Sequence, residues 1–289
     1  MLYGTGTALV TPMNNDGSVN EEALRRLVDF QEENGVDMLL PCGSTGEAAT
    51  LTTEEHLNVI RIVRDQAKRA KVVAGAGSNC TWEAVELSKV ADDLGADAIL
   101  SISPYYNKPT QEGIVQHYRT IAESVDIPLI VYNVPSRTAS NITADTEVRL
   151  ASIPNVVGVK EASGNIDQIR EIIDRTPDTF KVFSGDDSMT YDVMNSGGAG
   201  VFSVVSNCLP REVSQLVNHL RDGEKDKALA LHDKLMPLFK GAFIESNPIP
   251  IKYIMAKLGF GTDFCRLPLT PLSEPSRKVI DEMLEPYGL

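Results

Sequence analysis

The 289-residue sequence carries a formal net charge of -13, and 42% of its residues are hydrophobic and 23% charged. This composition is ordinary for a soluble globular protein. The negative charge argues against a nucleic-acid partner, because phosphates are bound by clustered lysines and arginines. No apolar run approaches the roughly 20 residues of a membrane span, so no membrane partner is expected. The N-terminus begins with a strand-like pattern instead of a charged leader, and we expect a cytoplasmic protein.

Neither the cysteines nor the histidines form a recognisable ligand pattern. The four cysteines lie far apart without a Cys-x-x-Cys pair, which favours free or buried thiols over disulfides or zinc. The four histidines are not clustered either, so we expect no catalytic metal. The cysteines are Cys42, Cys80, Cys208 and Cys265.

Short apolar runs alternate with helical patterns along most of the chain. The first helix is expected after Ser18-Val-Asn-Glu21, which has capping-box spacing, and before Asn34-Gly35. A second capping box begins at Thr52, and Pro210 opens the last helix of the series. The predicted strands are residues 5–10, 37–42, 72–77, 97–103, 128–134, 156–160, 181–185 and 200–205.

Eight strands alternating with eight helices, without hairpin turns between them, indicate parallel pairing through crossover helices. We therefore predict an α/β protein with a (β/α)8 TIM barrel over residues 1–223. Residues 224–289 contain helical patterns over 228–239, 250–258 and 275–284 and no strand, so a C-terminal helical domain is predicted.

The sixth apolar run ends in Lys160, and this is the first candidate for chemistry. A lysine at the rim of a low-dielectric interior loses part of its charge, because desolvation lowers its pKa. The neutral amine is a nucleophile that forms Schiff bases with carbonyl substrates. The alternative is a structural ion pair with a carboxylate such as the neighbouring Glu161.

Barrel enzymes build their sites at the carboxyl ends of the strands, and other polar residues fall there. Gly43-Ser-Thr-Gly-Glu47 follows the second strand, where backbone N–H groups and hydroxyls could converge on a small anion, or where a turn could simply cap a helix. Tyr132 ends the fifth strand and can shuttle a proton, and Arg137 in the following loop can bind a carboxylate. Together these groups fit Schiff-base chemistry on an α-keto acid.

Six motifs resemble those of the dihydrodipicolinate synthase family, within the superfamily that also contains N-acetylneuraminate lyase. The resemblance covers essentially the whole chain and implies condensation of pyruvate with L-aspartate-4-semialdehyde in lysine and diaminopimelate biosynthesis, without a cofactor, by a homotetramer. The motifs are Gly43-Ser-Thr-Gly-Glu47, Pro104-Tyr-Tyr-Asn-Lys-Pro-Thr-Gln-Glu-Gly113, Tyr132-Asn-Val-Pro-Ser-Arg-Thr138, Val157-Gly-Val-Lys-Glu-Ala-Ser-Gly164, Ser184-Gly-Asp-Asp187 and Asn247-Pro-Ile-Pro-Ile-Lys252.

The resemblance implies a role for each matching residue. Lys160 would form the Schiff base with pyruvate, beside Tyr132 as proton donor and acceptor. Ser44 and Tyr106 would complete a hydroxyl relay, with Tyr106 supplied by a neighbouring subunit. The expected substrate-binding residues are Thr45, Arg137, Phe202 and Gly185, with Arg137 on the carboxylate of the aldehyde.

The sequence departs from the family pattern at three places. Ser44 stands where threonine is common, and the Ser-Thr pair resembles the sialic-acid lyase branch. Phe202 is bulkier than the usual aliphatic residue and is expected to tighten the pyruvate pocket. In the lysine feedback site, Thr53 and Ala48 replace a histidine and a serine, which argues against inhibition. The matching residues of that site are His56, Asn79, Glu83 and Tyr105.

Two rival functions remain open from the sequence. The first is a sialic-acid or 2-keto-3-deoxy sugar-acid aldolase, which would share Lys160 and Tyr132 but have no need of a guanidinium at Arg137. The second is a non-catalytic pyruvate-binding homologue, against which the complete set of Lys160, Tyr132, Ser44 and Tyr106 counts.

Overall fold

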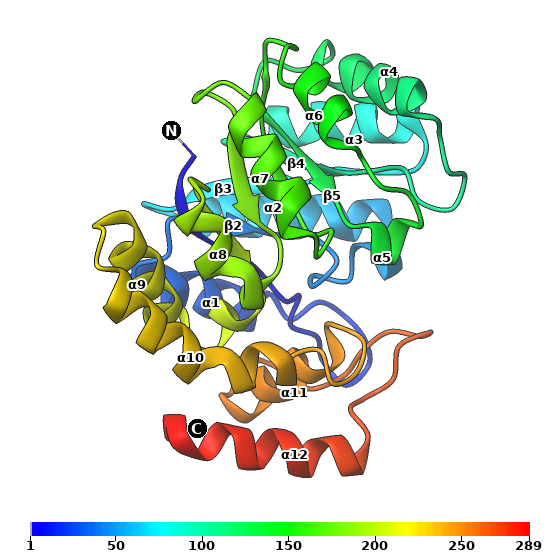
Figure 1. Cartoon of the computed structure of the whole chain (residues 1–289). Coiled ribbons are helices and arrows are strands. Elements are labelled where there is room, and N and C mark those ends of the chain that lie inside the picture. The colour runs from blue at the N-terminus through cyan, green and yellow to red at the C-terminus, as the bar shows by residue number, and fades with distance from the viewer. Residues whose placement is uncertain (1) are drawn as a thin grey trace.

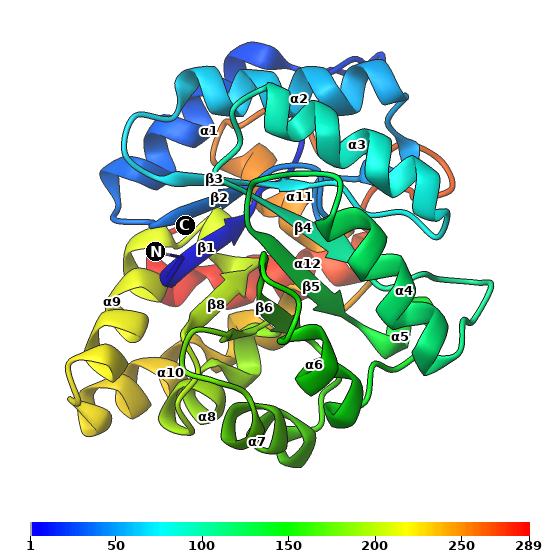
Figure 2. The same cartoon turned by 90° about the horizontal axis from the view of Figure 1, so that it is seen from above.

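The computed structural model describes residues 2–289 and contains a closed barrel of parallel strands in the order β1 to β8. Helices surround the strands, as Figure 2 shows in the view along the barrel. The predicted (β/α)8 fold is confirmed, and every strand except β6 is shorter than its predicted run. The strands are β1 (Gly4–Ala8), β2 (Met38–Leu40), β3 (Lys71–Gly75), β4 (Ala98–Ile102), β5 (Leu129–Asn133), β6 (Val156–Glu161), β7 (Lys181–Ser184) and β8 (Gly200–Ser203).

Both faces of the barrel strands are buried, which explains their nearly continuous apolar runs. One set of side chains packs inside the barrel and includes Leu40, Ile130 and Phe202. A larger set packs between the strands and the helices. Gly6 is required inside the barrel, because a Cβ atom there would lie 2.6 Å from the Phe202 ring. The aromatic ring thus fills space that the glycine leaves free.

The helices follow the strands in the predicted alternation (Figure 1). The capping box at Thr52 is present, with its hydroxyl on the Glu55 amide and the Glu55 carboxylate on the Thr52 amide. The α-helices before the C-terminal extension are α1 (Glu21–Glu33), α2 (Thr53–Gln66), α3 (Thr81–Asp93), α4 (Gln111–Ala122), α5 (Pro135–Thr138), α6 (Ala144–Leu150), α7 (Ile166–Arg175), α8 (Thr190–Asn195) and α9 (Pro210–Arg221).

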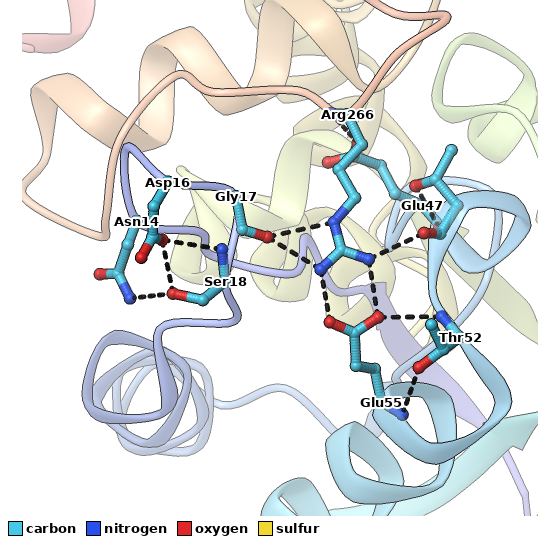
Figure 3. Close-up of polar contacts among 9 residues, drawn as sticks. Asn14, Asp16, Gly17, Ser18, Glu47, Thr52, Glu55 and Arg266 are labelled. Carbon is cyan, nitrogen blue, oxygen red and sulfur yellow. Dashed lines mark hydrogen bonds and ion pairs between the residues drawn. The ribbon is translucent and has the colours of Figure 1, made fainter.

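The predicted capping box at Ser18 is wrong. The N-cap of α1 is Asn20, whose side chain accepts a hydrogen bond of 2.9 Å from the Ala23 amide. Ser18 belongs instead to the preceding turn, where its hydroxyl donates to Asp16 at 2.6 Å and accepts from Asn14 at 2.9 Å (Figure 3). Because its hydroxyl is occupied there, Ser18 cannot cap the helix.

Two further details at the site end of the barrel differ from the sequence-based expectation. Pro135 to Thr138 form one helical turn, α5, so Arg137 does not lie in an irregular loop. Strand β6 continues to Glu161, which makes Lys160 its penultimate residue. Both differences shorten the irregular segments that carry candidate site residues.

The C-terminal extension is helical as predicted and consists of α10 (Lys225–Gly241), α11 (Ile249–Lys257) and α12 (Glu274–Leu284). α10 packs on α9, and α12 packs on α10 and α11 (Figure 1). The domain boundary at residues 223 and 224 stays a prediction. No helix within residues 2–289 has the length and apolar character needed to cross a membrane.

Candidate active site

Lys160 lies inside the barrel at the carboxyl end of β6. It pairs in register with Tyr132 on β5 and Phe183 on β7, and only 5% of it is exposed. Its Nζ lies 4.5 Å from the centre of the Tyr132 ring and 5.7 Å from that of Phe202. The amine therefore lies against the faces of two aromatic rings.

Burial lowers the pKa of Lys160 from 10.5 to about 8, and the positive charge of Arg137 adds to this effect, while the Asp187 carboxylate opposes it. Desolvation is the largest cause, as expected for an ammonium group in an apolar interior. A structural pair with Glu161 is not formed, because the Glu161 carboxylate bonds to Asn133 and Ser163 on the other side of the strand. A fraction of Lys160 is thus neutral near pH 7, and the neutral amine is the nucleophilic form.

The space for the Lys160 side chain is made by Gly185. A Cβ atom at Gly185 would lie 3.1 Å from Lys160 Cγ and 2.7 Å from the Ala162 Cβ. Phe202 and Phe183, whose rings are 5.1 Å apart, close the interior beside the amine. Gly185 and Phe202, both expected from the sequence to contact substrate, therefore border the lysine.

Tyr132 and Ser44 lie together at the ends of β5 and of the segment after β2. Burial raises the pKa of the Tyr132 phenol, and the Arg137 charge and the Ser44 hydroxyl offset part of this rise. The phenol is protonated at neutral pH and can donate to a developing oxyanion. Both residues line the same cavity, so the structure brings together the first two members of the expected relay.

The turn Gly43-Ser-Thr-Gly-Glu47 does not present a full set of free amides to an anion. The Gly46 and Glu47 amides donate to the carbonyls of Gly43 and Ser44, at 3.1 and 3.2 Å. The hydroxyl of Thr45 accepts a hydrogen bond of 3.0 Å from Asn247 Nδ2. The Ser44 and Thr45 amides and the hydroxyls of the same two residues therefore remain as the groups of the turn that could bind an anion.

Arg137 lies on α5 and lines the cavity. One of its nitrogens, Nη2, donates to the Asn247 carbonyl at 3.2 Å. A guanidinium has five N–H donors in a rigid fork. The remaining donors fit the bidentate carboxylate contact expected of Arg137.

Asp187 is a site neighbour to which the sequence assigned no role, although it lies in a quoted motif. Burial raises its pKa to about 6. Its Oδ2 accepts hydrogen bonds of 2.8 and 3.1 Å from the Val204 and Val205 amides, while Oδ1 has no partner within residues 2–289. The charged form of Asp187 favours the protonated form of Lys160, so the two groups are coupled electrostatically.

A cavity of about 480 Å³ connects the site with the expected lysine-feedback residues. Ser44, Tyr132 and Arg137 line it, and so do His56 and the residues Glu83, Tyr105, Thr53 and Ala48. Asn79 adjoins it by donating from Nδ2 to the Tyr105 carbonyl at 3.2 Å.

Tyr106 is not brought to the site of its own chain. It is 88% exposed and is not among the residues that line the cavity. Its φ of 72° is unusual for a residue with a side chain. The backbone amide of Tyr106 donates to the Thr138 carbonyl at 3.4 Å, which ties its loop to the end of α5.

The geometry defines a class of protein. A (β/α)8 barrel with a partly neutral lysine, a buried phenol and an arginine at the carboxyl ends of its strands has the parts of a class I, Schiff-base-forming aldolase site. Among residues 2–289 no group of three or more His, Cys, Asp or Glu side chains is arranged to hold a metal ion.

The chain belongs to the dihydrodipicolinate synthetase family, whose model matches residues 1–286. A relative from Chloroherpeton thalassium named 4-hydroxy-tetrahydrodipicolinate synthase is 51% identical over 290 residues, which cover 100% of this chain and 96% of the relative. The resemblance inferred from the motifs is thereby confirmed, and the chain is an enzyme of the lyase type.

Solved structures agree with this assignment. The dihydrodipicolinate synthase from Aquifex aeolicus is 46% identical with a TM-score of 0.98, covering 100% of this chain and 99% of its own. The chloride-inhibited enzyme from Acinetobacter baumannii, solved in complex with pyruvate, is 44% identical with a TM-score of 0.98 and the same coverage.

Proposed function

We propose that this enzyme condenses pyruvate with L-aspartate-4-semialdehyde to 4-hydroxy-tetrahydrodipicolinate in the cytoplasm, as a step of lysine and diaminopimelate biosynthesis. The observation that carries the proposal is Lys160, a buried amine with a pKa lowered to about 8 beside Tyr132, in a chain about half identical to a named synthase. No cofactor is needed, because the amine itself activates the keto acid.

In the first half-reaction the neutral amine of Lys160 attacks the ketone carbon of pyruvate, and loss of water gives the imine. The cationic imine makes the methyl hydrogens acidic, and transfer of one of these protons to the neighbouring hydroxyl relay leaves a neutral, nucleophilic enamine. Tyr132 is the group next to Lys160 that can move these protons, with Ser44 as its neighbour. We assign the binding of the keto-acid carboxylate to the Thr45 hydroxyl, which lies next to Ser44 in the same turn.

In the second half-reaction the enamine carbon attacks the aldehyde carbon, and the aldehyde oxygen takes up a proton. The amino group of aspartate semialdehyde then displaces Lys160 from the imine carbon, which closes the ring and frees the enzyme. The carboxylate of this substrate needs a cation for orientation, and Arg137 on the cavity wall supplies one.

Replacement of Arg137 by alanine tests this function. A charge-assisted contact contributes about 1.5–3 kcal/mol, so kcat/KM with aspartate semialdehyde should fall roughly 10- to 150-fold. Borohydride should still trap the pyruvate adduct at Lys160. Arg119→Ala, which removes an exposed guanidinium on α4, is the control and should leave kcat/KM unchanged.

Condensation that survives the loss of Arg137 would contradict the proposal. A wild-type enzyme that cleaves N-acetylneuraminate faster than it condenses aspartate semialdehyde would replace it with the sugar-acid aldolase function. If the protein forms no covalent adduct with pyruvate at all, the remaining alternative is a non-catalytic pyruvate-binding homologue.

We also propose that the enzyme is a homotetramer in which Tyr106 reaches the site of a neighbouring subunit. The support is that this tyrosine is 88% exposed and is not among the residues that line the cavity of its own chain. Dilution to monomers should then abolish most turnover. A fully active monomer would refute the proposal.

For lysine as an effector we propose weak inhibition or none. His56, Glu83 and Tyr105 line the cavity, but so do Thr53 and Ala48, which lack the contacts of inhibited family members. Titration of initial rates with lysine decides the matter, since half-inhibition well below about 1 mM, a binding free energy near 4 kcal/mol, would show the expectation wrong.

A further inference from the structure

Asn247 does not follow any of the eight strands, yet it contacts Thr45 and Arg137, the residues proposed to bind pyruvate and aspartate semialdehyde, respectively. It belongs to the segment between α10 and α11, and 5% of it is exposed. Its side-chain Nδ2 donates to Thr45 Oγ1 at 3.0 Å, and its main-chain carbonyl accepts from Arg137 Nη2 at 3.2 Å. Asn247 also lines the cavity.

The side-chain contact determines what the Thr45 hydroxyl can do. An amide NH₂ group only donates, so the bond from Asn247 occupies a lone pair of Thr45 Oγ1. The hydroxyl proton of Thr45 is then left to donate to another acceptor. In the proposed function that acceptor is the carboxylate of pyruvate, and the hydroxyl is oriented before the substrate arrives.

The position of Asn247 is fixed by the start of α11. The Lys252 side chain on this helix forms a buried ion pair with Glu47, two residues after Thr45 in the turn. The Lys252 amide donates to the Pro248 carbonyl at 2.9 Å, which joins the ion pair to the residue next to Asn247. The start of α11 and the residue that precedes it by two positions therefore contact the turn at Glu47 and Thr45, respectively.

Arg266 contacts the same turn from further along the extension. Its amide donates to Glu47 Oε2 at 3.1 Å. Its guanidinium lies between the Gly17 carbonyl and the Glu55 carboxylate, as Figure 3 shows. The turn that carries Ser44 and Thr45 is thus fixed by the C-terminal extension as well as by its own backbone bonds.

We propose that Asn247 is a positioning residue that orients the Thr45 hydroxyl toward the carboxylate of the keto acid. The inference rests on the proposed function, because it takes pyruvate as the ligand of that hydroxyl. According to this proposal, the side chain of Asn247 affects the binding of pyruvate and not that of aspartate semialdehyde. The contact with Arg137 uses the main chain, which a side-chain substitution leaves in place.

The test is the pyruvate concentration that gives half-maximal borohydride trapping at Lys160. In Asn247→Asp the carboxylate can only accept a hydrogen bond. The Thr45 hydroxyl would therefore donate to this carboxylate instead of to pyruvate, and a negative charge would lie near the substrate. The half-saturating concentration should rise by roughly 10- to 100-fold, as for a lost contact to a charged group. In Asn247→Ala the hydroxyl rotates freely, and a rise of roughly threefold to tenfold is expected, since only the cost of ordering is added.

Two further measurements separate positioning from a general structural effect. The KM for aspartate semialdehyde should stay near the wild-type value in Asn247→Ala, because the carbonyl that holds Arg137 remains and no charge is added. In a Thr45→Val background, Asn247→Ala should cause no additional loss, since the residue acts through the missing hydroxyl.

Asn155→Asp is the matched control. Asn155 precedes β6 at the opposite end of the barrel, and its Nδ2 donates to the Ala122 and Val125 carbonyls at 2.7 and 3.0 Å. This substitution should lower the melting temperature without changing the half-saturating pyruvate concentration. It therefore reports what destabilisation alone does to trapping.

Failure of the inference can be distinguished from failure of the proposed function. A wild-type enzyme that is not labelled by pyruvate contradicts the function itself. Normal labelling of the wild type with equal half-saturation in both Asn247 variants overturns the positioning role alone. A loss that persists at full size in the Thr45→Val background overturns it as well.

Discussion

The inner and outer faces of β5 and β6 both carry buried ionisable groups, but in opposite surroundings. Tyr132 pairs with Lys160 inside the barrel, and the next residues along the strands, Asn133 and Glu161, pair on the outer face. Glu161 accepts from Asn133 Nδ2 at 3.0 Å and from the Ser163 amide at 2.7 Å. Lys160 faces aromatic rings and has no hydrogen-bond or ion-pair partner recorded within residues 2–289.

Glu161 and Lys160 are both buried, but they differ in whether hydrogen bonds compensate for the loss of solvent. Burial raises the pKa of Glu161, and its hydrogen bonds to Asn133 and Ser163 counteract the rise. Burial lowers the pKa of Lys160 to about 8, and only the Asp187 charge counteracts it. Hydrogen bonds reduce the cost of burying the Glu161 carboxylate, whereas the Lys160 amine lacks such partners within residues 2–289 and is available to a substrate.

The largest expected effect is that of Lys160→Met. Turnover and the pyruvate adduct should be lost, while stability at pH 7 should increase by about 3 kcal/mol, the equivalent of a lysine pKa lowered from 10.5 to about 8. Since the folded state disfavours the charged amine, the cost is full below pH 8 and disappears as the pH rises to 10.5. Denaturant unfolding at pH 7 and 10 measures this, and a variant less stable than the wild type at pH 7 would contradict it.

Tyr132→Phe removes the phenol beside the amine and keeps the ring. Loss of a general acid or base typically lowers turnover by about 10²- to 10⁴-fold. Trapping at Lys160 should remain detectable, because the nucleophile is intact. A variant with wild-type turnover would remove Tyr132 from the mechanism.

On the outer face, Glu161→Ala should affect stability instead of chemistry. The Asn133 side chain and the Ser163 amide would lose a buried acceptor, at a cost of about 1–3 kcal/mol. Glu171→Ala on the exposed face of α7 is the control and should cost at most about 1 kcal/mol, since its partner Arg175 is a surface residue. Equal unfolding midpoints for the two variants would contradict the comparison.

Glu147 is a second buried carboxyl near Glu161, and unlike Glu161 it lacks hydrogen-bond partners within residues 2–289. It is fully buried on α6, both of its carboxylate oxygens lack a partner within residues 2–289, and burial and the Glu161 charge raise its pKa well above 4.5. The folded state binds this proton more tightly than the unfolded state, so stability should fall as the pH rises above 4.5. Glu147→Gln should flatten that dependence, and identical pH profiles of unfolding would show the carboxyl to be ionised in the fold.

The fold was predictable because its signals are local. Strands buried on both faces produce apolar runs, and caps such as Thr52 mark the helices between them. Ser18 was misassigned because a preceding turn had already engaged its hydroxyl, which capping-box spacing does not reveal. The helical turn that contains Arg137 has only four residues, which is too short to show the helical periodicity of apolar residues in the sequence.

The site was predictable only in part. Lys160 and Tyr132 follow from the rule that barrel sites form at strand ends, together with the resemblance of their motifs. The contacts of Asn247 with Thr45 and of Lys252 with Glu47 join residues 202 and 205 positions apart. No local pattern encodes such pairs, although the motif that contains Asn247 and Lys252 was visible.

The most direct test of the central claim is borohydride trapping of pyruvate from pH 6 to 10 with peptide mapping of the adduct. The initial trapping rate should rise with the neutral fraction of Lys160, with a midpoint near pH 8, and the label should lie on Lys160. Lys252, also buried, is paired with Glu47 and should stay unlabelled. Labelling of Lys252 or another lysine, or an active enzyme without any adduct, would contradict the account.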